Sequence, residues 1–369
     1  MINRHHLPLA VYYEHPEWFR PLFAELDRRS IQYVRIDAGC HGYDPTAADR
    51  NYALLVNRMS ASAYLRGNVQ GIFFTRDYLA HLESIGTRVI NGCKAFSFEI
   101  SKAAQLALLH SLGLATPRSR IVNCAIEVIS AAEEIGFPVI IKPNIGGRGA
   151  RIIRLDSAPE LARAAAAGTI GFGIDSTALV QEFFPVRGGH ITRVETLGGK
   201  FLYAIKVYPS GENFNLCPAE ICRTEEEACG ANTAALADAP KTGLKVEAFT
   251  PPREIIGAVE KIVAAAQIEV GSVEYLIDDR DGTVVYYDIN VLSNFVATAA
   301  EIVGFDPHVP LVDYLSARRR GSNALWLLAP SLWRLAPKRG GRTDGGDMGI
   351  REPSGATKRR DRIRSHADR

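Results

Sequence analysis

The sequence predicts a small α/β domain with a parallel sheet, followed by a longer α+β region. In residues 1–92, short apolar strands alternate with helical patterns, which is typical of parallel strands joined by helices. Beyond residue 178, pairs of strand patterns flank turn signals, which instead indicates antiparallel hairpins. The chain has 369 residues, of which 47% are hydrophobic and 23% charged, so it can form two or three domains of about 150 residues each.

The first part, residues 1–92, is expected to form a small sheet with helices on both faces. Its expected strands and helices are, in order, strand 9–14, helix 19–30, strand 31–37, strand 52–58, helix 71–84 and strand 87–91. The segment HPEWF follows the first strand, where a dinucleotide-binding domain would carry Gly-x-Gly-x-x-Gly. This argues against a Rossmann dehydrogenase.

The second part is expected to contain two subdomains, residues 93–178 and 179–320. One helix is expected over 97–113, because apolar residues recur at helical spacing and Gly113 is a typical C-terminal stop. The elements expected after it are strand 121–124, helix 125–136, strand 137–143, strand 178–185, two hairpins and a helix from about 252 to 267. The Gly- and Arg-rich residues 321–369 are expected to be mostly disordered.

Composition and charge exclude several classes of protein. The 43 Lys and Arg nearly balance the 41 Asp and Glu, and residues 338–369 alone hold 10 basic against 5 acidic side chains. The body is therefore slightly acidic, and no specific binding of nucleic acid is expected. No apolar run of 18 residues and no signal-peptide pattern occur, so a cytoplasmic protein without a transmembrane segment is expected.

A glycine-rich loop follows the apolar strand FPVIIKP. Lys142 lies at the end of this strand, and Gly146, Gly147 and Gly149 follow in the loop. Glycines let backbone N–H groups approach a polyphosphate closely, and a lysine fixed on a strand supplies a point charge. The interpretation is a nucleotide-phosphate site, and a plain glycine turn remains the alternative.

The strand pattern ALVQEFFP offers a surface for a nucleotide base. It ends in Gln181, Glu182, Phe183 and Phe184, and a strand that leaves one subdomain can present backbone groups to an adenine edge beside aromatic rings. A core strand with a polar exit is the alternative.

Two cations are expected side by side in the hairpin HITRVETLGGKFLYAIKVY. If Leu197 pairs with Lys200 around the Gly-Gly turn, Arg193 and Lys206 lie diagonally adjacent on one face. Two neighbouring cations favour a phosphate-binding cleft, whereas solvated surface charge is the alternative.

The segment GSVEYLIDDRDGTVVYYDIN predicts a metal site. A hairpin centred on Asp281 sets Glu274 directly opposite Asp288, with Asn290 two residues further on the same face. Opposed carboxylates repel, whereas a hard cation such as Mg²⁺ prefers oxygen ligands and can be shared with phosphates. A solvated acidic hairpin is the alternative.

The order of these parts resembles the ATP-grasp superfamily of carboxylate-amine ligases. Within it, the chain is similar to the ribosomal-protein glutamate ligases and to glutathione-synthetase-like enzymes. The resemblance covers residues 90–316 and implies two α+β subdomains that grip ATP, with residues 8–90 as the usual preceding α/β domain. It carries over Lys102, Lys142, Gln181, Glu182, Phe184 and Asn215 as ATP-binding residues, Arg193 and Lys206 as phosphate-facing residues, and Glu274, Asp288 and Asn290 as metal ligands.

The resemblance implies an ATP-dependent ligase that uses Mg²⁺ or Mn²⁺. Arg193 and Lys206 would balance charge on the transferring phosphoryl group, and the acyl phosphate formed from a substrate carboxylate would react with an amine. The expected partners are small-molecule or peptide carboxylates and amines, and homo-oligomers are not excluded. The chain reads NVLSNF where the glutamate ligases continue with Ser-Pro-Gly, so the substrates stay unassigned. A non-catalytic ATP-binding sensor or scaffold is the alternative function.

Overall fold

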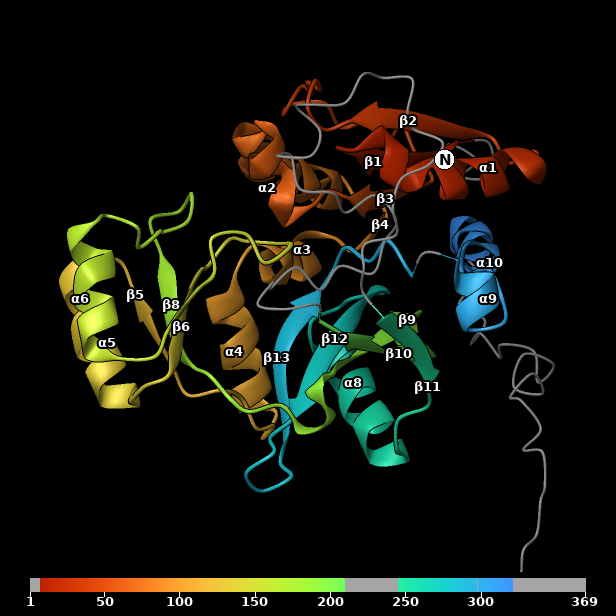
Figure 1. Cartoon of the computed structure of the whole chain (residues 1–369). Helices are drawn as coiled ribbons and strands as arrows, with labels where there is room; N and C mark the ends of the chain where they lie inside the picture. The colour runs from red at the N-terminus through yellow and green to blue at the C-terminus, as the bar shows by residue number, and fades with distance from the viewer. Residues whose placement is uncertain (1–6, 210–244, 297, 321–369) are drawn as a thin grey trace, which may run out of the picture. The chain divides into compact units, whose positions relative to one another are not determined.

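In the computed structural model, which describes residues 7–209, 245–296 and 298–320, the strands form three sheets (Figure 1). The first is parallel and the other two are antiparallel, as the change of pattern along the sequence predicts. The expected disordered tail, residues 321–369, lies outside the described residues.

The first sheet has the strand order β2-β1-β3-β4. Its elements are β1 (Leu9–Tyr13), η2 (Pro16–Phe19), α1 (Arg20–Arg28), β2 (Tyr33–Asp37), β3 (Leu54–Arg58), η3 (Ala61–Arg66), α2 (Val69–Ser84) and β4 (Val89–Ile90). Successive residues of β1 alternate between faces: Leu9 and Val11 pack with α1, whereas Ala10 and Tyr12 pack with α2. Both faces are therefore buried, as expected for a parallel sheet.

The second sheet has the order β5-β8-β6-β7. Its elements are β5 (Ser119–Val122), α5 (Ala125–Ile135), β6 (Val139–Pro143), β7 (Ile153–Leu155), α6 (Ala158–Ala166) and β8 (Ala178–Glu182). Helices α5 and α6 lie together on one face of this sheet (Figure 1), where Val128, Leu161 and Val180 share a core. The opposite face carries residues that line the cavity described below.

The third sheet has the order β11-β10-β9-β12-β13. Its elements are η4 (Arg187–Gly189), β9 (Ile191–Leu197), β10 (Lys200–Tyr208), β11 (Lys245–Phe249), α8 (Arg253–Ala265), β12 (Val270–Ile277), β13 (Val284–Asn290), α9 (Ala299–Ile302) and α10 (His308–Arg319). Helix α8 packs on one face through Val259 and Val263, and α10 packs toward the other through Leu311 and Leu315.

The single helix expected over 97–113 is wrong, because the chain forms α3 (Cys93–Glu99) and α4 (Lys102–Ser111) with a break between them. Ser101 is extended at the break, with φ −154°, and its Oγ accepts a hydrogen bond from Ala104 N at 3.1 Å. This is an N-cap, which favours a new helix start over continuation of the old one. The break sets Glu99 and Lys102 at two helix ends that face the same cavity.

The sheets also divide the chain differently from the expected boundary at residue 178. Strand β8 pairs with β5 and β6, so the second sheet extends to Glu182. Helix α4 packs against the third sheet instead, where Gln105 Nε2 donates to Ile289 O at 2.8 Å and Gln105 Oε1 accepts from Ile289 N at 3.0 Å.

Asn91, directly after β4, joins the first domain to the third sheet. Its Nδ2 donates to Val270 O at 2.6 Å and to Val291 O at 2.8 Å. Its Oδ1 accepts from Glu269 N at 2.8 Å, and its own carbonyl accepts from Asn57 Nδ2 at 3.1 Å. The residue has a φ of 55°, in the left-handed region that asparagine tolerates better than most side chains.

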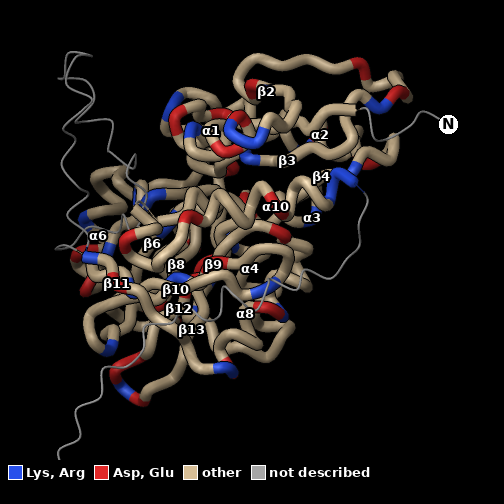
Figure 2. Tube along the Cα trace, turned by 90° about the vertical axis from the view of Figure 1, so that its right-hand side faces the viewer, with Lys and Arg blue, Asp and Glu red and all other residues tan. Residues whose placement is uncertain are grey.

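Basic and acidic residues are mixed along the described trace in Figure 2. No helix in the described part of the chain is both long enough and apolar enough to cross a membrane.

Candidate active site

A cavity of about 650 Å³ is lined by the second and third sheets and by loops of the first domain. The first domain contributes Trp18, Ser60 and Ser62, and the second sheet and its loop contribute Lys142, residues 146–150 and residues 181–184. The third sheet contributes Arg193, Glu274 and residues 287–290, and helices α3 and α4 contribute Glu99 and Lys102. The cavity thus gathers most of the residues that the sequence marks as ATP-binding or metal-binding.

Strands β12 and β13 hold the two carboxylates in the register expected from the sequence. Glu274 lies directly opposite Asp288. Nearer the turn the register differs by one residue, because a bulge between Glu274 and Tyr275 leaves Tyr287 as the extra residue on β13. The bulge lets Tyr287 line the cavity beside Asp288, and its hydroxyl donates to Glu274 Oε2 at 2.8 Å.

The two carboxylates lie among three cations. Lys102 Nζ forms an ion pair with Asp288, and Arg193 Nη1 donates to Glu274 Oε1 at 3.3 Å. Burial opposes ionisation of Asp288, but Lys102 and Lys142 outweigh it and lower its pKa. Burial and the charge of Asp288 raise the pKa of Glu274. Such a pair of opposed carboxylates, with Glu274 buried and Asp288 half-buried, is stabilised by added positive charge.

A divalent cation fits this set of donors. Two carboxylates face each other, and Asn290, which donates through Nδ2 to Glu274 Oε1 at 3.3 Å, can bring its amide oxygen to the same place. Three oxygen donors of this kind are what Mg²⁺ and Mn²⁺ prefer. No group of three His, Cys, Asp or Glu side chains suited to a metal occurs among the described residues, so this set depends on the amide.

Lys142 lies at the end of β6, 4% exposed, and faces the cavity. Burial, and next the charge of Lys102, lower the pKa of Lys142 to about 7. Burial also opposes the charge on Lys102, but Asp288 outweighs it and raises the pKa of Lys102. Among the ion pairs of the described residues, no carboxylate is in direct contact with Lys142. An anionic ligand would therefore stabilise the charged form of Lys142 more than that of Lys102.

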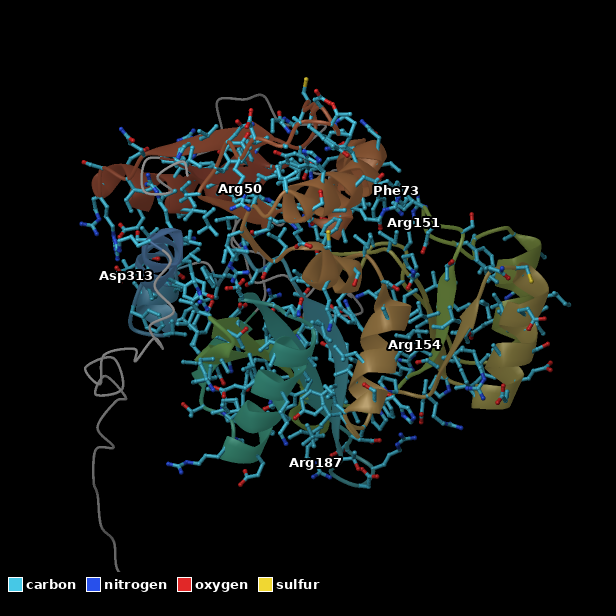
Figure 3. All side chains as sticks on the ribbon, turned by 180° about the vertical axis from the view of Figure 1, so that it is seen from behind. Arg50, Phe73, Arg151, Arg154, Arg187 and Asp313 are labelled. Atoms are coloured by element: carbon cyan, nitrogen blue, oxygen red, sulfur yellow. The ribbon has the colours of Figure 1, made fainter. Side chains whose placement is uncertain are left out.

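The glycine-rich loop between β6 and β7 adopts a strained backbone. Arg148, Gly149 and Arg151 have φ values of 59°, 69° and 60°, all in the left-handed region. The loop lies against the first domain: a Cβ on Gly147 would come within 3.0 Å of Ser62 Cβ, and Arg151 lies 5.9 Å from the Tyr64 ring centre. Figure 3 labels Arg151 in this loop and Arg154 in β7, which follows it. Strained backbone of this kind is frequent at ligand-binding loops, but Ser30 and Gln267 have similar φ values away from the cavity, so the strain alone assigns no ligand.

The expected base-binding strand lies along the same cavity. Gln181 Nε2 donates to Ser119 Oγ at 2.9 Å, and Phe184 lies under the Arg280 guanidinium at 4.8 Å. Glu182 is held between Arg118 at 2.9 Å and Arg280 at 2.9 Å. Burial raises the pKa of Glu182, but hydrogen bonds from these two arginines outweigh it and lower the pKa.

Arg193 faces the cavity as expected, but Lys206 does not. A register shift between Phe201 and Tyr203 places Arg193 opposite Ile205 and Lys206 opposite Thr192, so the two cations lie on opposite faces of the sheet. The ammonium of Lys206 lies 4.6 Å from the ring centre of Phe249. The expectation that Lys206 lies beside Arg193 is wrong, because a bulge in β10 adds one residue before Tyr203. Asn215 lies outside the described residues.

Sequence reasoning missed Glu99, which is half-buried and lines the cavity. Its Oε1 accepts from Ala61 N at 3.2 Å, and its Oε2 accepts from Val291 N at 2.9 Å and Leu292 N at 3.1 Å. The carboxylate therefore joins α3, the segment after β3 and the segment after β13. The only available signal was Ser101, a typical N-cap residue, which marks the helix break beside Glu99.

Residues 101–186 match the family model described as the carbamoyl-phosphate synthase L chain, ATP binding domain. A D-alanine–D-alanine ligase from Pseudomonas fluorescens is 33% identical over 93 residues, which are 25% of this chain and 28% of the relative. A probable alpha-L-glutamate ligase from Teredinibacter turnerae is 30% identical over 135 residues, 36% of this chain and 44% of the relative. The chain thus spans less than half the length of these relatives.

Solved structures match over most of the chain. The ATP-grasp ligase PsnB complexed with a minimal precursor has a TM-score of 0.57 at 20% identity, covering 85% of this chain and 99% of that chain. A D-alanine–D-alanine ligase from Bacillus anthracis has a TM-score of 0.59 at 15% identity, covering 85% and 99% respectively. At these identities the likeness establishes the fold.

Proposed function

We propose that this chain, an ATP-grasp protein by its fold and by its ATP-binding segment, is a ligase that joins a carboxylic acid to an amine. In the first step, a carboxylate oxygen attacks the γ-phosphorus of ATP, the bond to the bridging oxygen breaks, and ADP leaves with the electron pair. In the second step, the amine nitrogen attacks the acyl carbon, the carbon–oxygen bond to phosphate breaks, and the amine loses a proton. The products are an amide, ADP and phosphate.

One observation supports the proposal most directly. Oxygen donors suited to a divalent metal, three cationic side chains and a glycine-rich loop line the same cavity. Glu274 and Asp288 face Lys102, Lys142 and Arg193 there. Phosphoryl transfer needs little covalent chemistry from the protein, and depends on positioning and on charge stabilisation. The charges that line this cavity are of the kind that such a reaction uses, and the reaction needs no side-chain nucleophile.

The proposed division of roles follows the position of each side chain. Lys102 and Lys142 would hold the phosphates, and Arg193 would face the phosphoryl group in transfer. Glu274, Asp288 and Asn290 would hold Mg²⁺ or Mn²⁺, which when bound neutralises phosphate charge. The strand end Gln181–Phe184 would receive the base, with Arg118 and Arg280 keeping Glu182 in place.

The substrates are proposed by class only. The relatives include a D-alanine–D-alanine ligase and a probable alpha-L-glutamate ligase, whose names state amino acids, and PsnB is complexed with a minimal precursor. We take a small-molecule or peptide carboxylate and amine as the substrate classes.

The test is acid-dependent ADP release. Purified protein with ATP and Mg²⁺ is supplied with single carboxylic acids and with hydroxylamine, which attacks acyl phosphates and yields hydroxamates. An acid that raises ADP release and gives its hydroxamate supports the proposal. ATP binding without ADP release from any acid in a broad panel would favour the sensor or scaffold alternative.

A further inference from the structure

The segment after β3 brings two serine hydroxyl groups to the cavity. Ser60 and Ser62 are 7% and 3% exposed, and both line the cavity at the carboxyl end of a parallel strand. In open parallel sheets, ligands bind outside the carboxyl ends of the strands. Neither serine has a role in holding ATP or metal in the function proposed above.

Among the described residues, the hydrogen bonds of the two serines leave one hydroxyl proton without an acceptor. Ser60 Oγ lies 2.8 Å from Ser62 Oγ and accepts from Ser62 N at 3.1 Å, while Ser62 Oγ accepts from Arg66 Nη1 at 3.3 Å. A hydroxyl group has one proton and two lone pairs. If Ser62 donates to Ser60, both lone pairs of Ser60 are filled and its proton has no acceptor within the pair. If Ser60 donates to Ser62, the same is true of the proton of Ser62.

Arg66 donates a hydrogen bond to this serine pair and is itself held in place by Glu14 and Trp18. Arg66 forms a forked ion pair with Glu14, with Nε at 2.9 Å from Oε1 and Nη2 at 2.6 Å from Oε2. Its guanidinium lies 4.6 Å from the ring centre of Trp18, which itself lines the cavity. A hydrogen-bond chain that begins at a cation strengthens the last donor in the chain. The pair therefore presents one strengthened O–H donor, which favours a ligand atom rich in lone pairs.

The pair lies beside the glycine-rich loop. A Cβ on Gly147 would come within 3.0 Å of Ser62 Cβ, and Ala61, between the two serines, donates its N–H to Glu99. The loop is the segment that we assign to the phosphates of ATP. A ligand that accepts the hydroxyl proton would therefore lie next to the terminal phosphate rather than next to the base, which is assigned to Gln181–Phe184.

We infer that Ser60 and Ser62 form the site for the carboxylate group of the acid that is activated. The inference rests on the proposed ligase function, since that reaction places a carboxylate next to the γ-phosphate. One hydroxyl donates to one carboxylate oxygen, and the other oxygen is left to attack phosphorus. The pair holds the reactant in place and takes up no proton, because a carboxylate enters the reaction without one.

The experiment measures acid dependence and ATP affinity separately. Acetate, D-alanine and L-glutamate are tested with ATP, Mg²⁺ and hydroxylamine, and the acid that gives most hydroxamate is used for kinetics. The variants are Ser60→Ala, Ser62→Ala and the double variant. Ser84→Ala, an exposed serine at the end of α2 whose hydroxyl bonds only to the backbone of its own helix among the described contacts, is the matched control.

The double variant is expected to raise the KM for the acid by about ten- to a hundredfold, the scale for one hydrogen bond to a charged group. In the double variant, the dissociation constant of ATP should stay within about twofold of the wild-type value, because no hydrogen bond to ATP is removed. Ser84→Ala should match wild type in the KM for the acid and in the dissociation constant of ATP. Because Ser60 Oγ also accepts from Ser62 N, the double variant can lose stability, and Ser62→Ala, which keeps that bond, then carries the test with the same expected direction.

The outcomes separate this inference from the function on which it rests. Hydroxamate formation by wild type with an unchanged KM for the acid in both Ser62→Ala and the double variant overturns the carboxylate site and leaves the ligase function in place. Weaker ATP binding in Ser62→Ala assigns the serines to support of the loop and also overturns it. No hydroxamate from any acid with wild type counts against the ligase function, and the site is withdrawn with it.

Discussion

Replacing Arg193 with lysine keeps the positive charge but removes the planar fork. In the structure, Nε donates to Glu195 at 2.7 Å, Nη1 to Glu274 at 3.3 Å and Nη2 to Ser293 at 3.2 Å. A lysine offers all its donors from one atom, so it can keep one of the two carboxylates and loses the other contacts. Both lost hydrogen bonds, one to a carboxylate and one to Ser293, involve the charged guanidinium, and one such bond contributes about 1.5–3 kcal/mol. Arg193→Lys should therefore lower the free energy of unfolding by about 3–6 kcal/mol.

The same change should slow the chemical step by about ten- to a hundredfold, because the fork is needed most where phosphoryl charge is redistributed. The free energy of unfolding is measured in urea, and it is compared between variants whose unfolding free energy has the same slope against urea concentration. The rate of the chemical step is measured as single-turnover ADP formation at saturating ATP. Arg187→Lys is the matched control, since Arg187 in η4 pairs at the surface with Asp279 of the β12–β13 turn at 3.1 Å (Figure 3). An unchanged rate with weaker ATP binding would make Arg193 a ground-state binding residue and refute the role assigned to it. An unfolding free energy equal to that of the control would refute the energetic argument.

Three further predictions address metal, phosphate and packing. Asp288→Ala should reduce acid-dependent ADP release by about a hundredfold or more at saturating Mg²⁺, with an unchanged circular dichroism spectrum, and normal turnover would remove Asp288 from the metal set. Lys142 has a pKa of about 7 and is mostly neutral at pH 8, and bound phosphates raise that pKa. ATP binding should therefore be accompanied by uptake of a proton, and its affinity should fall as the pH rises above 7. Calorimetry in two buffers should detect this uptake in wild type and not in Lys142→Ala. In urea unfolding, Gly198→Ala should lower the free energy of unfolding by about 2–4 kcal/mol and Gly199→Ala by about 1–2 kcal/mol. Both glycines have a positive φ, but only at Gly198 would an added Cβ come within 2.8 Å of the Tyr314 ring. Equal losses in the two variants would contradict the packing argument.

The fold class could be predicted because hydrophobic periodicity marks each element locally. The change from parallel to antiparallel sheets follows the change from helix-linked to turn-linked strands, and it is confirmed. The register at Glu274 and Asp288 is also as expected. The bulge beside it was not, since an extra residue such as Tyr287 is indistinguishable in the sequence from its neighbours in an alternating strand.

The same limit explains Lys206 and Glu99. The bulge before Tyr203 moves Lys206 to the far face, and the helix break at Ser101 brings Glu99 to the cavity. Both depend on one-residue irregularities, which side-chain packing selects and which periodicity does not record.

The hydrogen bonds of Asn91 limit where this chain can be cut into fragments that fold. The matched ATP-binding segment begins at residue 101, which suggests a module that could be cut out and expressed alone. A fragment that begins after Asn91 would leave the carbonyl groups of Val270 and Val291 and the amide of Glu269 without their partner. Water can solvate these groups once the first domain is removed, so each lost hydrogen bond costs about 0.5–1.5 kcal/mol, and together these losses are a sizeable share of the roughly 5–15 kcal/mol that is typical of a folded domain. The N-terminal domain thus contributes to the stability of the third sheet, and a domain exchange between relatives should keep β3, with Asn57, on the same piece as Asn91.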